Sequence, residues 1–201
     1  MVATWLTCEP PPAKSTFAVL FVCTANECRS PIAEHLARAL SSALGLNWRI
    51  ASAGTQTVGG RPINPLAEKA LAKHGLHPDP TWRSTRLTPA LLAEADLVLT
   101  ATARHRSRVV TTHSPAVDRT FQLLHFARLA AVAGADEPRL PASDPWNVLT
   151  VLQARRSAVQ PVRNGADDIA DPIGHRFRAF RSCAETTSRA LNQMMASFSA
   201  G

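Results

Sequence analysis

The chain has 201 residues, of which 45% are hydrophobic and 18% are charged, and this composition is typical of a globular protein with a sizeable core. No apolar stretch reaches the roughly 20 residues that a membrane-spanning helix needs, so we expect no membrane partner. The formal charge of +7 favours anionic partners. Nucleic acid is nevertheless disfavoured as a partner, because the arginines are spread along the whole chain and there is no tyrosine.

The first residues contain three consecutive prolines and no long apolar run. We therefore expect a disordered tail over residues 1–15, rather than a signal peptide, followed by a single domain over 16–201. The four cysteines form no CxxC pair, which indicates free thiols in a reducing cytoplasm. The sequence also lacks HExxH and paired Cys/His spacings, so we expect no metal and no cofactor.

Apolar runs and helical periodicities alternate along the chain. The predicted strands are 17–22, 48–54, 96–100 and 116–123, and the predicted helices are 31–44, 64–75, 88–95, 103–112, 123–132 and 174–195. Residues 134–168 are rich in Pro, Asp and Asn, which predicts a long loop insertion with one helical piece near 148–156. This alternation predicts an α/β fold, a doubly wound four-stranded parallel sheet with helices on both faces.

The most informative segment is the loop that follows the first strand, CTANECRS from Cys23 to Ser30. A tight loop that enters a helix directs several backbone N–H groups into one concavity, and the helix dipole makes that concavity positive. The loop therefore predicts a site for a tetrahedral oxyanion. Arg29 adds a planar group that binds two oxygens at once, and the same positive field favours the thiolate of Cys23.

The remaining loop residues are candidates for binding the oxyanion: Thr24, Ala25, Asn26, Glu27, Cys28 and Ser30. We expect Ser30 to cap the helix and to donate its hydroxyl to the thiolate. Small Ala25 permits close approach of the backbone, and Asn26 tolerates the left-handed conformation that a cradle-shaped loop needs. The alternative is a buried cysteine beside a solvated arginine, but the strand before the motif and the Ser-Pro helix start after it favour a functional site.

The segment VLFVCTANECRSPIAEHL resembles the N-terminal signature of the low-molecular-weight protein tyrosine phosphatases, and the resemblance continues in ASAGT, ALAKHGL, STRLTPALLAEADLVLT and DIADPIGHRFRAF. It implies a flavodoxin-like phosphatase fold and a cysteine-dependent, metal-independent hydrolysis of protein phosphotyrosine or a related phosphomonoester. Cys23 would attack phosphorus to form a phosphocysteine, while Arg29 and the loop amides hold the oxygens. The implied partner is a phosphorylated protein, with inorganic phosphate or another oxyanion binding in the same loop.

The resemblance also implies a general acid from an Asp-Pro pair, of which the chain has two. Asp171 precedes the last helix, as the family's aspartate does, and Gly174 permits the sharp turn there, so we favour Asp171 over Asp144. A helix cap is the alternative role for either aspartate. Cys28 resembles a redox guard that traps an oxidised nucleophile as a disulfide, and a small buried side chain is its alternative role.

The sequence departs from the family at the walls of the cleft. Aromatic residues usually give phosphotyrosine specificity, but residues 56–58 and Ile173 stand at those positions, unless Trp82 or Trp146 folds in.

Glu27 stands where the family often has an apolar residue, and a branch of the family acts on phosphoarginine, whose guanidinium would suit a carboxylate. We therefore keep a protein-arginine phosphatase and a non-catalytic phosphate-binding module as alternatives. An arsenate reductase is disfavoured, because no cysteine follows the third strand in the segment where that chemistry needs two.

Overall fold

The computed structural model describes residues 16–136, 144–157, 159–160, 162 and 165–198, so the expected tail over residues 1–15 lies outside the described residues. Its centre is a four-stranded parallel sheet in the order β2-β1-β3-β4. The strands are β1 (Phe17–Cys23), β2 (Trp48–Gly54), β3 (Leu97–Thr100) and β4 (Thr120–Gln122). The predicted doubly wound parallel sheet is thereby confirmed.

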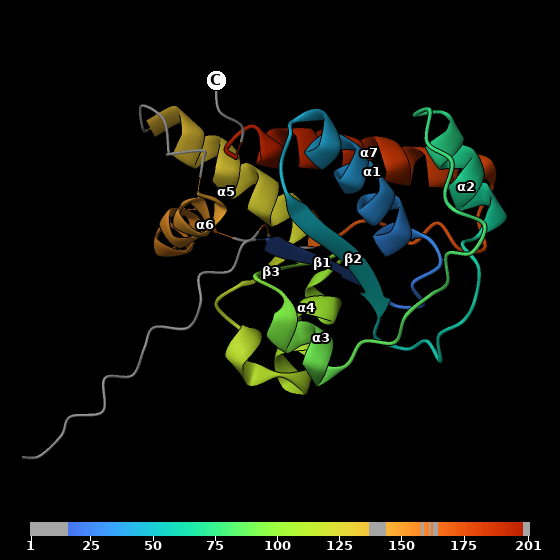
Figure 1. The fold of residues 1–201 in the computed structure, drawn as a ribbon, viewed down its shortest axis with the longest axis horizontal. Helices are drawn as coiled ribbons and strands as arrows, with labels where there is room; N and C mark the ends of the chain where they lie inside the picture. The colour runs from blue at the N-terminus through green and yellow to red at the C-terminus, as the bar shows by residue number, and fades with distance from the viewer. Residues whose placement is uncertain (1–15, 137–143, 158, 161, 163–164, 199–201) are drawn as a thin grey trace, which may run out of the picture.

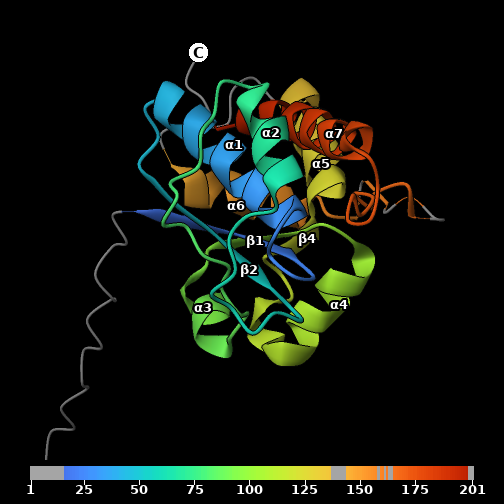
Figure 2. The same ribbon diagram turned by 90° about the vertical axis from the view of Figure 1, so that its right-hand side faces the viewer.

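Helices cover both faces of the sheet (Figures 1 and 2). One face carries α1 (Arg29–Ala43), α2 (Pro65–Ala72), α5 (Leu123–Asp136), α6 (Pro145–Ala154) and α7 (Phe177–Met195). The other carries α3 (Pro89–Glu94), α4 (Ala103–Thr112) and the 3₁₀ turn η1 (Ser114–Ala116). No described helix is both long enough and apolar enough to cross a membrane.

The central strand β1 explains how the two hydrophobic cores form. All seven of its residues are buried, as expected for a strand covered on both faces. Side chains alternate across a strand, so Phe17, Val19 and Phe21 enter the larger core beneath α1 and α7, whereas Leu20 and Val22 enter the smaller core beneath α3 and α4. Cys23 ends this strand on the side of the larger core.

The topology places the end of β1 at a switch point. Cys23 pairs with Gly54 of β2, and Val22 pairs with Thr100 of β3 on the opposite side. The chain leaves β1 for α1 on one face of the sheet and leaves β3 for α4 on the other. In such sheets the diverging connections open a crevice at the carboxyl ends of the strands, and Cys23 lies at this position.

Several element boundaries differ from the prediction. The fourth strand is limited to Thr120–Gln122, because Pro115, which favours the start of a helical turn, places the preceding residues in η1. The last helix begins at Phe177 instead of residue 174, because Gly174 adopts a left-handed conformation with φ 81°. The helical piece within 134–168 begins at Pro145, ahead of the expected 148, because Asp144 caps it. Helix α5 also continues to Asp136.

Candidate active site

The loop from Cys23 to Ser30, called the oxyanion loop below, connects the end of β1 to the start of α1. Cys23 is buried, and its Sγ lies 3.0 Å from Oγ of Ser30. Ser30 sits within the first turn of α1, so its hydroxyl reaches back to the sulfur and does not cap the helix. The expected capping role is therefore wrong: Cys28 occupies the N-cap position, and no side chain there makes a capping hydrogen bond.

Asn26 holds the oxyanion loop in shape. It is fully buried and is the only described non-glycine residue with a positive φ, at 57°, which confirms the expected left-handed conformation. Its Nδ2 donates to Oγ of Ser30 at 2.9 Å and to Oγ of Ser52 at 2.7 Å. Its Oδ1 accepts from the backbone N–H of Thr85 at 2.7 Å. One side chain thus joins the loop to α1, to β2 and to the segment before α3.

The network continues to a buried carboxylate that the sequence analysis did not single out. The Ser52 hydroxyl donates to Oε2 of Glu34 at 2.6 Å, and Arg38 pairs with Oε1 at 2.7 Å. The indole N–H of Trp82 also reaches Oε2, at 3.3 Å. Burial raises the pKa of Glu34, and these donors oppose that shift. A buried carboxylate with this many partners anchors the far side of the loop.

Neither tryptophan considered as an aromatic wall is available for that role. Trp82 packs against α1, with its ring centroid 6.2 Å from that of His35. Trp146 packs edge-on against Phe17, at the opposite end of β1 from Cys23. The groups at the expected wall positions are therefore residues 56–58 and Ile173, which is 46% exposed.

Arg29 joins the oxyanion loop to the loop before α7. Its guanidinium is buried, forms an ion pair with Oδ2 of Asp171, and donates to Oγ1 of Thr24 at 3.1 Å. Asp171 is partly exposed and lies 142 residues away in the sequence. Asp144, by contrast, accepts hydrogen bonds from the backbone of Trp146 and Asn147 and so acts as the cap of α6. The structure thus brings Asp171 to the candidate site and gives Asp144 a structural role.

Two further thiols lie close to Cys23. Cys28 and Cys183 are both buried, and no disulfide joins the three described cysteines. Burial, reinforced by the nearby Cys23, raises the pKa of Cys28 strongly, and burial raises that of Cys183 to about 12. Both are therefore neutral thiols near neutral pH. Cys28 is buried at the start of α1, as its alternative role requires, and the redox-guard role stays a prediction.

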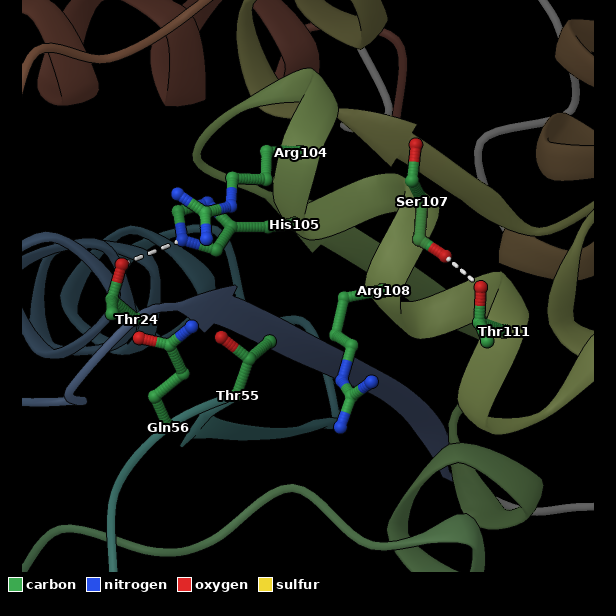
Figure 3. A pocket seen from close by; sticks show the side chains of 8 residues that line it. All are labelled: Thr24, Thr55, Gln56, Arg104, His105, Ser107, Arg108 and Thr111. Atoms are coloured by element: carbon green, nitrogen blue, oxygen red, sulfur yellow. Dashed lines mark hydrogen bonds between the residues drawn. The ribbon is translucent and has the colours of Figure 1, made fainter.

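A pocket of about 450 Å³ opens beside Thr24, between the oxyanion loop and α4 (Figure 3). The buried His105 lies at the wall of this pocket. Its Nε2 is hydrogen-bonded to Oγ1 of Thr24 at 2.8 Å, and its Nδ1 is hydrogen-bonded to Oγ1 of Thr102, also at 2.8 Å. Burial, together with the positive charge of Arg29, lowers the pKa of His105 to about 4. A neutral imidazole therefore supports Thr24 and, through it, Arg29. No pattern in the sequence pointed to this histidine.

Glu27 is engaged with a guanidinium of the chain itself. Its Oε1 lies 3.0 Å from Nε of Arg61, and its backbone carbonyl accepts from the N–H of Asn64 at 2.9 Å. This ion pair reduces the repulsion that a carboxylate in the oxyanion loop would otherwise exert on an anionic substrate.

Comparisons with known proteins identify the family of the chain. Residues 18–147 match the family described as low molecular weight phosphotyrosine protein phosphatase. A protein-arginine-phosphatase of Geobacillus stearothermophilus is 32% identical over 178 residues, which cover 89% of this chain and 93% of that protein. A probable low molecular weight protein-tyrosine-phosphatase, EpsP, of Ralstonia nicotianae is 28% identical over 149 residues, which cover 74% and 90%. The crystal structure of a low molecular weight protein tyrosine phosphatase from T. tengcongensis matches with a TM-score of 0.66 and 27% identity, covering 90% of this chain and 99% of that one. The chain belongs to the low molecular weight phosphotyrosine protein phosphatase family.

Proposed function

We propose that the protein is a cysteine-dependent, metal-independent phosphatase that hydrolyses protein phosphotyrosine, or a related phosphomonoester, through a phosphocysteine intermediate. The observation that carries this proposal is the ion pair between Arg29 and Asp171, which joins an oxyanion-binding residue to a carboxylate at the same site as Cys23. The expected cytoplasmic location belongs to the proposal, because a reducing compartment keeps such a thiol free.

In the first step, the phosphate lies in the oxyanion loop, whose amides hold its three non-bridging oxygens together with Arg29. Arg29 then exchanges its contact with Asp171 for the phosphate, and the freed Asp171 carboxylate takes up a proton from solvent so that it can serve the leaving group. The thiolate of Cys23 forms the S–P bond while the P–O bond breaks, and Asp171 gives its proton to the departing oxygen.

In the second step, Asp171 accepts a proton from water while the water oxygen attacks phosphorus. The S–P bond breaks, inorganic phosphate forms, and the electron pair returns to Cys23. The Ser30 hydroxyl, 3.0 Å from Sγ, donates a hydrogen bond to that thiolate in both steps. It therefore assists Cys23 both as the attacking group and as the leaving group.

A second candidate substrate is phosphoarginine, and the pair between Glu27 and Arg61 favours it. This contact supports the view that a guanidinium fits beside the oxyanion loop, where an arginine leaving group would depart. In that reaction the P–N bond breaks and the proton passes to nitrogen. Release of Glu27 from Arg61 would then be part of substrate binding.

The test uses two peptides of the same sequence, one with phosphotyrosine and one with phosphoarginine, with EDTA present throughout. Turnover of the phosphotyrosine peptide supports the proposal, whereas turnover of the phosphoarginine peptide alone favours the second candidate. We expect Glu27→Ile to raise kcat/KM for phosphotyrosine and to lower it for phosphoarginine. Binding of phosphate by a folded protein that hydrolyses neither peptide would contradict both reactions and indicate a non-catalytic phosphate-binding module.

A further inference from the structure

The pocket beside Thr24 carries two arginines that the mechanism above does not use. Arg104 and Arg108 lie four residues apart on α4, so both side chains leave the same face of the helix and line the same pocket (Figure 3). Within the described part of the chain, neither guanidinium makes a hydrogen bond or an ion pair, whereas those of Arg29 and Arg61 are each paired with a carboxylate.

The field in this pocket is positive. Its described lining consists of hydroxyls, one amide, the neutral imidazole of His105 and the two guanidiniums, without a carboxylate. The acidic groups that act on His105 at the pocket wall are already engaged: Asp168 accepts from the backbone N–H of Ala103 and from the amide of Gln122, each at 2.8 Å, and Asp171 pairs with Arg29. Like charges one turn apart on a helix repel each other, and an anion between them would relieve that repulsion.

The pocket is continuous with the oxyanion loop. Thr24 directly follows Cys23 and lines the pocket, while the backbone N–H groups of Thr55 and Gln56 donate to the carbonyls of Cys23 and Thr24, both at 2.9 Å. The wall of the pocket and the oxyanion loop thus form one hydrogen-bonded unit. A volume of about 450 Å³ accommodates side chains that flank a phosphorylated residue in the loop.

We propose that this pocket is a subsite for an acidic side chain of a protein substrate. Arg104 and Arg108 bind the carboxylate of that side chain, which lies close in sequence to the phosphorylated residue. The inference rests on the proposed function, because the phosphorylated residue itself occupies the oxyanion loop. An extended chain advances about 3.3–3.6 Å per residue, so the carboxylate belongs to one of the few residues on either side. The subsite selects among phosphoproteins and takes no part in the chemical steps.

The test compares two phosphopeptides that differ only in the flanking residues, which are Glu in one and Gln in the other. Both are prepared in a phosphotyrosine and a phosphoarginine series. The test variant is Arg104→Gln with Arg108→Gln. The control is Arg181→Gln with Arg189→Gln, which removes the same charge from exposed positions of α7 on the opposite face of the sheet, together with the surface ion pair of Arg181 with Glu185. An aryl phosphate without flanking groups reports the chemistry alone.

We expect wild type and the control to prefer the acidic peptide by about fivefold to tenfold in kcat/KM at low salt, mainly through KM. The preference should shrink as ionic strength rises. The Arg104/Arg108 variant should lose it and still hydrolyse the aryl phosphate at the wild-type rate. Three results would each contradict the proposed subsite. They are equal kcat/KM for the two peptides in wild type, a preference for the acidic peptide that the test variant retains, and a loss of that preference in the control as large as in the test variant.

Failure of the proposed function is a separate outcome. It appears as no hydrolysis of the aryl phosphate or of any peptide. In that case the affinities of the two peptides for the Cys23→Ser variant show whether the pocket binds the acidic side chain. Tighter binding of the acidic peptide supports the subsite, and equal affinities contradict it.

Discussion

Replacing Asn26 tests whether the oxyanion loop is held in shape by one buried side chain. Asn26→Ala removes three hydrogen bonds, to Ser30, Ser52 and the backbone N–H of Thr85. It also places alanine at φ 57°. Asn26→Gly loses the same hydrogen bonds but tolerates the positive φ. Comparing the two variants therefore separates the loss of hydrogen bonds from the strain of the left-handed backbone.

The expected loss follows from these contacts. A hydrogen bond contributes about 1 kcal/mol net, and two of the three bonds that Asn26 makes, those to Ser30 and Ser52, are buried, so the loss of all three costs about 3 kcal/mol. A left-handed conformation costs a non-glycine residue roughly 1–2 kcal/mol. We therefore expect Asn26→Ala to lower the free energy of unfolding by about 3–5 kcal/mol, and Asn26→Gly to lower it by about 1 kcal/mol less.

The assay is urea denaturation, combined with kcat/KM for an aryl phosphate. Because the loop amides must point at the phosphate, we expect both variants to lose at least about 100-fold in kcat/KM. Equal stability of the Ala and Gly variants would refute the argument from backbone conformation. A loss below about 0.5 kcal/mol in both would refute the argument from buried hydrogen bonds.

Three further predictions concern the surroundings of the loop. Gly54→Ala places a Cβ 2.8 Å from the carbonyl oxygen of Thr24, so we expect at least a tenfold lower kcat/KM for aryl phosphate, and unchanged kinetics would contradict a rigid contact there. Asp171→Ala should lower kcat by about 100-fold or more, whereas Asp144→Ala should cost only about 1 kcal/mol of stability as a lost cap; the reverse result would exchange their roles. The pKa of His105 lies at about 4 in the folded protein but near 6.5 in the unfolded chain, so the unfolded chain takes up a proton first as the pH falls. The free energy of unfolding should therefore decrease by up to about 3 kcal/mol between pH 6.5 and 4, and His105→Gln should flatten this slope in urea titrations; an unchanged slope would contradict the assignment.

The sequence predicted those parts of the site that depend on neighbouring residues. The apolar run of β1 ending at Cys23, and the choice of Asn26 for a left-handed position, follow from local patterns and are present in the structure. The preference for Asp171 over Asp144 rests on the family resemblance, in which the acid precedes the last helix, and the two aspartates do lie in different settings.

The parts that sequence reasoning missed depend on contacts between distant segments. His105 meets Thr24 across 81 residues, and Glu34 is held by side chains of β2 and of the segment before α3. Neither position departs from an ordinary helical pattern, so periodicity carries no signal for it. The capping role expected of Ser30 is wrong for a local reason: α1 begins at Arg29, earlier than the predicted residue 31, so Ser30 lies inside the helix, where its hydroxyl makes the expected contact with Cys23.

The most direct test of the account is to find where phosphate becomes attached during turnover. The protein is mixed with an aryl phosphate in EDTA, quenched with acid within the first turnover, and digested for mass spectrometry. We predict one phosphoryl group on the peptide that contains Cys23, and neither the phosphoryl group nor turnover in Cys23→Ser. Turnover that persists in Cys23→Ser, or phosphate attached to another residue, would contradict the proposed mechanism.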